Sequence, residues 1–128
     1  MQIHQSAEDY LETILMLTQR MGRVRSIDVV NELGYTKASV SIAMKKLREN
    51  GYIAVDGEGN LTLLEPGREI AERIYSRHRL LTHFFVQLGV DEEIAAEDAC
   101  KAEHILSEQT LEKIREYALL HDAQDSVK

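Results

Sequence analysis

The feature that most constrains the fold of this chain is a change of hydrophobic period at Gly51. Before that glycine, apolar residues recur at the spacing of α-helices. After it come two short apolar runs, 52–55 and 61–64, which are separated by Asp-Gly-Glu-Gly-Asn. Two such runs around a glycine-rich turn are typical of a β-hairpin. The sequence therefore predicts several helices followed by one hairpin in the first half of this 128-residue chain.

Three helices are expected before the hairpin. Ser6 with Asp9 three residues later resembles a capping box at the start of the first helix. Gly34 stops the second helix, and Thr36 can cap the third. This order is that of a winged helix-turn-helix, in which the second helix of the pair enters the major groove of DNA. The expected bounds are residues 6–21, 26–33 and 37–50.

The start of the third helix is built from small or polar residues, so it can approach base edges closely. Basic residues further along that helix are better placed to neutralise backbone phosphates. The alternative is an ordinary helical corner whose polar face is only solvated. The candidate DNA-contacting residues are Thr36, Lys37, Ala38, Ser39, Ser41, Lys45, Lys46 and Arg48.

The charges are unevenly distributed along the chain, whose formal net charge is −7. Residues 20–50 contain seven Lys/Arg against three Asp/Glu, whereas residues 91–128 contain four against eleven. A basic segment on an acidic body is compatible with one DNA-binding face, because binding responds to the local potential. The alternative interpretation of these charges is two solvated surfaces.

Three more helices are expected after the hairpin. Pro66 suits the first turn of a long helix, and Asp91 and Ser107 can cap the two that follow. The last eight residues are expected to fray. The predicted fold class is mainly α with a small β-hairpin wing, and the expected division is a winged helix-turn-helix domain over 1–64 and a helical domain over 65–128. The expected helix bounds are residues 66–88, 92–105 and 108–120.

Metal-ligand residues cluster in the run ACKAEHIL. On a helix, Cys100, Glu103 and His104 would share one face, because their spacings are three and four residues. Thiolate, carboxylate and imidazole all bind divalent transition metals, but three ligands on one helix rarely complete a site. Partners are available on two other helices: Asp9 and Glu12, one turn apart, and His78.

Each candidate ligand also has a structural alternative. Asp9 can simply cap its helix, and His78 can be a partly exposed structural histidine. Cys100 alone can be a small buried apolar residue. Glu103 and His104 can be solvated polar positions.

Five segments of the chain resemble the diphtheria toxin repressor family of bacterial and archaeal metal-dependent regulators, and most closely its short, manganese-transport-regulator type. The resemblance covers nearly the whole chain in the family's order. It implies a metal-dependent DNA-binding transcriptional regulator, not an enzyme, in which residues 65–128 form a metal-binding and dimerisation domain. The segments are SAEDYLETI, SIDVVNELGYTKASVSIAMKKLRENGYI, LTLLEPGREIAERI, SRHRLLTHFFVQLGVDEE and EDACKAEHILSE.

The resemblance implies that Asp9, Glu12, His78, Glu103 and His104 are metal ligands. Cys100 stands where manganese-type members have Glu and iron-type members have Cys, whereas iron-type members have Met at the position of Asp9.

The iron-type ancillary site also needs groups that Thr82 and Ala96 do not supply. A thiolate favours softer ions and carboxylates favour harder ones. The expected effector is therefore Fe²⁺ or Mn²⁺, and Co²⁺ or Zn²⁺ can bind in vitro.

The resemblance further implies a homodimer that binds a palindromic DNA operator and represses genes of metal-ion homeostasis. The alternative is a winged-helix regulator without a metal effector. A Cys/His enzyme is disfavoured because no HExxH motif or phosphate-binding loop accompanies Cys100. A structural zinc site would normally show a closed Cys/His set.

The cellular compartment follows from the composition. A single cysteine fits a reducing cytoplasm. No stretch approaches the roughly 20 apolar residues of a membrane span, and the N-terminal residues lack the pattern of a signal peptide. We therefore expect a cytoplasmic protein without a membrane partner.

Overall fold

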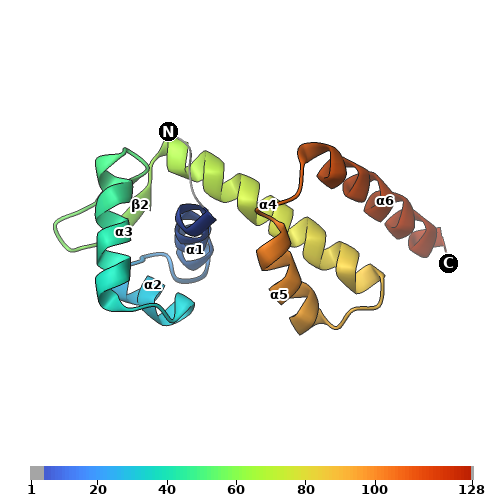
Figure 1. The fold of residues 1–128 in the computed structure, drawn as a ribbon, viewed down its shortest axis with the longest axis horizontal. Helices are drawn as coiled ribbons and strands as arrows, with labels where there is room; N and C mark the ends of the chain where they lie inside the picture. Colours follow the sequence, from blue (N-terminus) through green and yellow to red (C-terminus); the bar gives the residue numbers. More distant parts are fainter. Residues whose placement is uncertain (1–4, 128) are drawn as a thin grey trace. The chain divides into compact units, whose positions relative to one another are not determined.

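The computed structural model describes residues 5–127 and confirms the predicted fold class. Its helices and strands follow one another in the expected order (Figure 1). The elements are α1 Gln5–Met21, α2 Ser26–Leu33, α3 Lys37–Glu49, β1 Ile53–Val55, β2 Leu61–Leu63, α4 Glu65–Gln87, α5 Glu92–Ala102 and α6 Glu108–Val127. Among the described residues, no helix has both the length and the apolar character needed to span a membrane.

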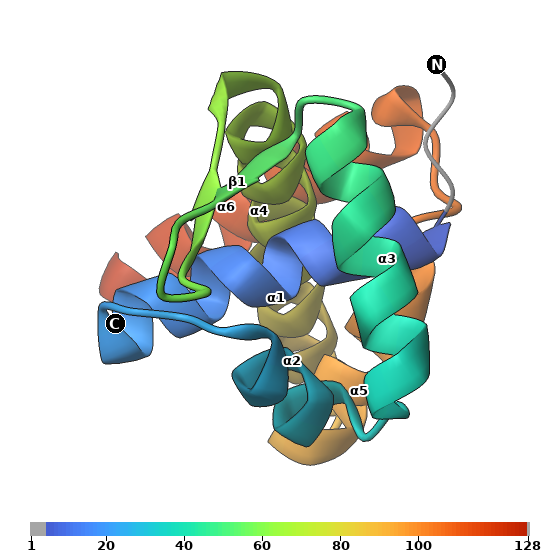
Figure 2. The same cartoon turned by 90° about the vertical axis from the view of Figure 1, so that its left-hand side faces the viewer.

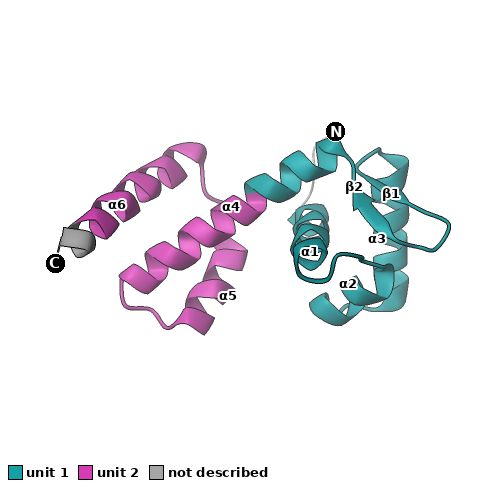
Figure 3. Cartoon of the chain, turned by 180° about the vertical axis from the view of Figure 1, so that it is seen from behind, with its two compact units in different colours: residues 1–73 teal, residues 74–128 magenta. Residues whose placement is uncertain are grey.

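The chain forms two compact units, residues 1–73 and 74–128 (Figure 3). The division falls inside α4, which contributes its first part to one unit and the remainder to the other. The boundary expected from the sequence, between residues 64 and 65, lies at the start of this helix.

The first unit is built around α1, which packs against α2, α3 and β2. In Figure 2 this unit faces the viewer, and the hairpin and α3 lie side by side in front of α1. Apolar residues on each element close the core, as expected from the helical spacing before Gly51 and the alternation after it. The buried residues include Leu11, Ile14, Val29, Val40, Met44, Leu47, Ile53 and Leu61.

The hairpin pairs Ile53 with Leu63 and Val55 with Leu61 in antiparallel register. Its turn is fixed by Asp56, whose carboxylate accepts hydrogen bonds from the backbone N–H groups of Glu58 and Asn60, each at 2.9 Å. These bonds, chiefly those from Asn60, favour the charged carboxylate and so lower the pKa of Asp56. The wing is therefore a short hairpin with a rigid turn.

The first turn of α4 packs directly on the start of the hairpin. A side chain at Gly67 would collide with the backbone carbonyl of Tyr52 and would contact Leu11. Glycine is thus required here for the close approach of the two backbones. Pro66 lies beside it in the first turn of the helix, as predicted, where its missing N–H costs no helical hydrogen bond.

The second unit packs the rest of α4 against α5 and α6. Its buried centre is formed by Leu81, Ala99 and Leu111, one from each helix, and further partly buried apolar residues surround them. A polar contact supports this packing further along α4 and α6. The Nε2 of His83 lies 3.0 Å from both carboxylate oxygens of Asp122, and Gln87 donates a 2.8 Å hydrogen bond to the same carboxylate.

Predictions for the ends of three helices are wrong, whereas the other predicted helix bounds differ from the structure by no more than one residue. Ser6 does not cap α1, because Gln5 is already helical. The last helix continues to Val127 and does not fray after residue 120; no glycine or proline interrupts it, and Asp122 is bonded to α4. The predicted helix over 92–105 ends at Ala102, because the chain tightens there and the N–H of Ile105 bonds to the carbonyl of Ala102.

Candidate nucleic-acid interface and metal centre

The turn between α2 and α3 has the geometry of a helix-turn-helix. Gly34 adopts a left-handed conformation, φ 72°, and its N–H bonds to the carbonyl of Val30 at 2.8 Å. Glycine adopts this conformation without strain, so it can end α2 sharply. Thr36 then caps α3 as predicted, since its hydroxyl oxygen accepts a 3.1 Å hydrogen bond from the N–H of Ser39.

The third helix has one buried face and one exposed face. Val40, Met44 and Leu47 are buried against the rest of the unit. All eight side chains predicted to contact DNA are exposed, which is what a DNA-reading helix requires: Thr36, Lys37, Ala38, Ser39, Ser41, Lys45, Lys46 and Arg48. The hydroxyl of Thr36 also donates a 2.9 Å hydrogen bond to that of Ser39, so these two positions stabilise the helix start.

Glu103 lies at the centre of the four ligands predicted for the second unit, and the other three surround its carboxylate. The Glu103 side chain is fully buried. Its Oε2 lies 3.0 Å from Nδ1 of His78, and its Oε1 lies 3.4 Å from Nε2 of His104. The Sγ of Cys100 and a carboxylate oxygen of Glu103 are within 4.8 Å of each other. One carboxylate is thus surrounded by two imidazoles and a thiol.

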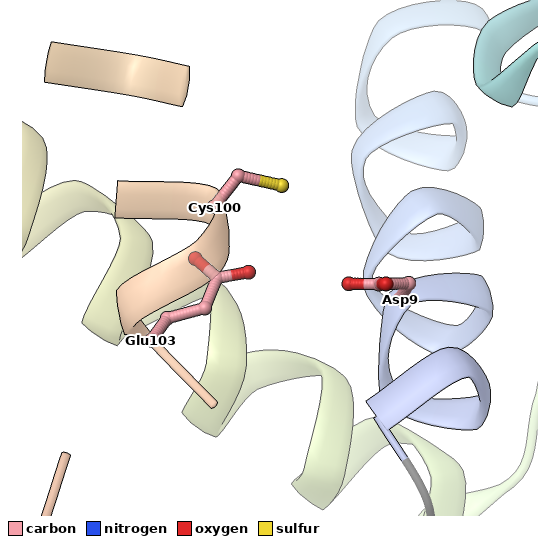
Figure 4. Close-up of side chains that lie close together, drawn as sticks. All are labelled: Asp9, Cys100 and Glu103. Atoms are coloured by element: carbon pink, nitrogen blue, oxygen red, sulfur yellow. The ribbon is translucent and has the colours of Figure 1, made fainter. Parts of the chain in front are cut away.

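Only one of the three ligands expected on a single helix lies within α5, although Cys100 and Glu103 are close together as their spacing predicts. Cys100 lies in the last turn of α5, whereas Glu103 and His104 lie in the turn after it. Figure 4 shows Cys100 and Glu103 on this part of the chain, with Asp9 of α1 drawn as the third candidate ligand. Cys100 is exposed, so the alternative of a small buried apolar residue is wrong for it.

The two predicted ligands of the first unit are Asp9 and Glu12, which lie three residues apart on α1. Glu12 is only 5% exposed, an unusual position for a carboxylate. Burial raises the pKa of the neighbouring Tyr10, and the charges of Tyr35 and Asp9 add to this shift. Asp9 lies inside α1 and not at its cap, so the structural alternative offered for this residue does not hold.

Arg77 was not singled out from the sequence, although it precedes His78. Its guanidinium donates a 3.2 Å hydrogen bond to the backbone carbonyl of Glu103 and forms an ion pair with Glu108 at the start of α6. Arg77 therefore joins α4 to the turn that carries Glu103 and His104. The sequence offered no signal for this contact, because the partners are 26 and 31 residues away.

The donor set fits a divalent metal ion. Among the described residues, Oε1 of Glu103 has no hydrogen-bond partner although it is buried. A buried, incompletely bonded carboxylate is costly unless a cation or donor compensates it. Carboxylate, imidazole and thiolate together suit first-row transition ions better than Mg²⁺ or Ca²⁺, which prefer oxygen ligands alone.

The fold places the chain among winged helix-turn-helix DNA-binding proteins, and the donor set adds a candidate metal centre. Comparisons with known proteins identify the family. Residues 2–61 match the N-terminal DNA-binding domain of iron dependent repressors, and residues 64–120 match their metal-binding and dimerisation domain. The chain belongs to the iron dependent repressor family.

Two relatives are similar over most of their length. An uncharacterized HTH-type transcriptional regulator of Methanocaldococcus jannaschii is 36% identical, over 87% of this chain and 90% of the relative. The HTH-type transcriptional regulator MntR of Bacillus subtilis is 32% identical, over 96% of this chain and 87% of the relative. Members of this family are transcriptional regulators, so the chain is a metal-dependent DNA-binding regulator and not an enzyme.

Solved structures show the same fold. A manganese-dependent transcriptional repressor in complex with manganese matches with a TM-score of 0.80 and 28% identity, over 88% of this chain and 52% of the other. IdeR of T. acidophilum also has a TM-score of 0.80, at 23% identity, over 91% of this chain and 55% of the other. This chain spans about half the length of those chains.

Proposed function

We propose that this protein represses genes of metal-ion homeostasis by binding a palindromic DNA operator when Fe²⁺ or Mn²⁺ is bound. The observation that carries the proposal is the buried Glu103 carboxylate, which has two imidazoles beside it and one oxygen without a hydrogen-bond partner among the described residues. A divalent cation would satisfy that oxygen and neutralise the acidic groups around it.

The proposed ligands are Asp9 and Glu12 on α1, His78 on α4, Cys100 in the last turn of α5, and Glu103 and His104 in the turn that follows. The first two belong to the DNA-binding unit and the other four to the second unit. An ion that binds both groups would couple the geometry of the reading helix to metal occupancy. Without the ion, the carboxylates repel one another, and ordering them lowers the affinity for DNA.

The choice between the two metals rests on opposing ligands. The thiolate of Cys100 favours Fe²⁺ over Mn²⁺, whereas the carboxylates of Asp9 and Glu12 favour the harder ion. The similarity to a manganese-dependent repressor solved with manganese supports Mn²⁺ as one candidate. Zn²⁺ and Co²⁺ are expected to bind in vitro because of their general affinity for such sites.

A homodimer explains the palindromic operator, because two-fold symmetric proteins present two equivalent reading helices. The second unit matches a dimerisation domain and exposes large apolar side chains, among them Leu119 and Leu120, 62% and 66% exposed. A regulator that binds operator DNA acts in the cytoplasm of a prokaryotic cell, which is the compartment expected from the sequence.

The test is DNA binding as a function of metal. Duplexes are selected from a random library with the Mn²⁺-loaded protein, and binding is then titrated anaerobically against Fe²⁺, Mn²⁺ and chelator. We expect metal to tighten binding by roughly 5- to 150-fold, the usual range of such couplings. Binding that is equally tight in chelator would favour the winged-helix regulator without a metal effector.

Variants of the ligands test the site itself. Glu12→Ala and His104→Ala should abolish most of the metal response while the circular dichroism spectrum and the dimer remain unchanged. Glu97→Ala, an exposed carboxylate on α5, is the matched control and should respond as the parent protein does. An unchanged metal response in both ligand variants would remove these residues from the site.

A further inference from the structure

The third helix exposes an isoleucine that the predicted DNA contacts do not include. Ile42 is 58% exposed, although isoleucine is among the residues most often buried. It is separated by two residues from Val40 and from Met44, both buried. Because each residue turns an α-helix by about 100°, Ile42 lies almost opposite the buried face of α3.

The surroundings of Ile42 on the helix are those of a base-reading surface. Four exposed residues lie three or four positions from it and form one outward stripe with it: Ala38, Ser39, Lys45 and Lys46. Lys37 and Arg48 lie beside this stripe and are also exposed. The helix contains a single acidic residue, Glu49, at its end. A basic border around a small apolar centre is complementary to a polyanion that presents methyl groups.

DNA offers such methyl groups in one place. In the major groove each A·T pair presents the C5-methyl of thymine, whereas unmodified cytosine has no methyl group there. A side chain that lacks donors and acceptors cannot read the hydrogen-bonding edge of a base, but it can bury against this methyl group.

We propose that Ile42 reads thymine in each operator half-site by packing on its C5-methyl group. This inference rests on the placement of α3 in the major groove. It adds to the function a sequence preference that comes from apolar contact, with Lys37 and Lys45 supplying affinity through phosphates or base acceptors.

The test uses duplexes that differ by one methyl group. In the selected operator, each thymine is replaced in turn by deoxyuridine, and binding of the full-length Mn²⁺-loaded protein is measured at fixed salt. We expect the parent protein to lose about fourfold in affinity at one or two positions per half-site, the effect of one buried methyl group. Ile42→Ala should show no loss at those positions.

The converse measurement adds a methyl group to the DNA instead of removing one. With a C·G pair at the sensitive position, 5-methylcytosine should bind the parent protein about fourfold more tightly than cytosine and should not affect Ile42→Ala. Ile42→Val, which keeps a branched apolar side chain, should retain part of the discrimination. Ile27→Ala, an exposed isoleucine on α2, is the control and should leave the pattern unchanged.

Two outcomes separate this inference from its premise. If Lys45→Ala weakens binding to all duplexes but Ile42→Ala keeps the same deoxyuridine pattern as the parent protein, Ile42 does not read thymine. The same conclusion follows if the parent protein is insensitive to deoxyuridine at every position. If Lys37→Ala and Lys45→Ala both leave binding unchanged, α3 is not the reading helix.

Discussion

At the scale of single residues, Glu103 is the organising group of the candidate metal centre. It is buried, and its two oxygens face imidazoles from α4 and from the turn after α5. Cys100 contributes a different property, since it is the one thiol in the chain and is exposed. Because Glu103 and the histidines suit many divalent ions, the residue at position 100 is the one expected to tune the choice of metal.

The selectivity of the site is therefore tested at Cys100. Cys100→Glu should shift the relative response from Fe²⁺ towards Mn²⁺, on the order of tenfold, because an oxygen ligand replaces the softer sulfur. The measurement is the concentration of each ion that gives half-maximal operator binding under anaerobic conditions. Cys100→Ser serves as the control for loss of sulfur without gain of a carboxylate. An unchanged ratio in Cys100→Glu would mean that the thiol is not a ligand.

At the scale of elements, the turn after α5 decides where the ligands lie. The helix ends at Ala102, and residues 103–105 form a tight turn. Arg77 of α4 holds this turn through the carbonyl of Glu103 and through Glu108 of α6. Since the side chain of Arg77 is only 15% exposed, its contacts are largely shielded from solvent. Arg77 is therefore placed to position the candidate metal ligands of this turn.

Removal of Arg77 should loosen the turn and weaken metal binding. We expect Arg77→Ala to lower the affinity for Mn²⁺ by about 10- to 100-fold, the range seen when groups that orient ligands are removed. Competition with a fluorescent chelator measures this affinity, and Arg77→Lys should recover part of it. The matched control is Arg115→Ala, because the Arg115 side chain on α6 is 43% exposed and forms an ion pair with Glu112 of the same helix. Equal affinities in Arg77→Ala and Arg115→Ala would contradict the positioning role.

At the scale of the whole molecule, the proposed mechanism is a coupling between two binding events. One unit carries the reading helix with Asp9 and Glu12, and the other carries the remaining ligands. If a single set of ligands binds the ion, the free energy of metal binding contributes to ordering the DNA-binding unit. Thermodynamic linkage then requires the effect to be reciprocal.

Reciprocity gives a prediction that needs no substitution. Saturating operator DNA should raise the affinity for Mn²⁺ by the same factor by which saturating Mn²⁺ raises the affinity for the operator. The expected coupling free energy is about 1–3 kcal/mol. Titration calorimetry with and without operator measures the first factor, and fluorescence anisotropy with and without metal measures the second. A duplex of scrambled sequence is the control. A metal affinity that is insensitive to operator, with operator binding that depends on metal, would contradict a shared equilibrium.

The sequence by itself determined the order of the elements and their type. The period of the apolar residues is local information, and so are the caps: Gly34 ends α2 and Thr36 starts α3 because of their own backbone and side-chain chemistry. The winged helix-turn-helix could therefore be predicted. The same holds for the types of the metal-ligand residues, although their assignment to one site required the family resemblance.

The tertiary structure decided what depends on distant residues. It ended α5 at Ala102, so that Glu103 and His104 lie in a turn. It also brought the guanidinium of Arg77 to the backbone carbonyl of Glu103, 26 residues away in the sequence. It extended α6 past residue 120, where Asp122 bonds to α4. It also left Ile42 exposed opposite the packed face of α3. These features depend on which helices pack together, and the apolar period of one segment does not specify which other segments pack against it.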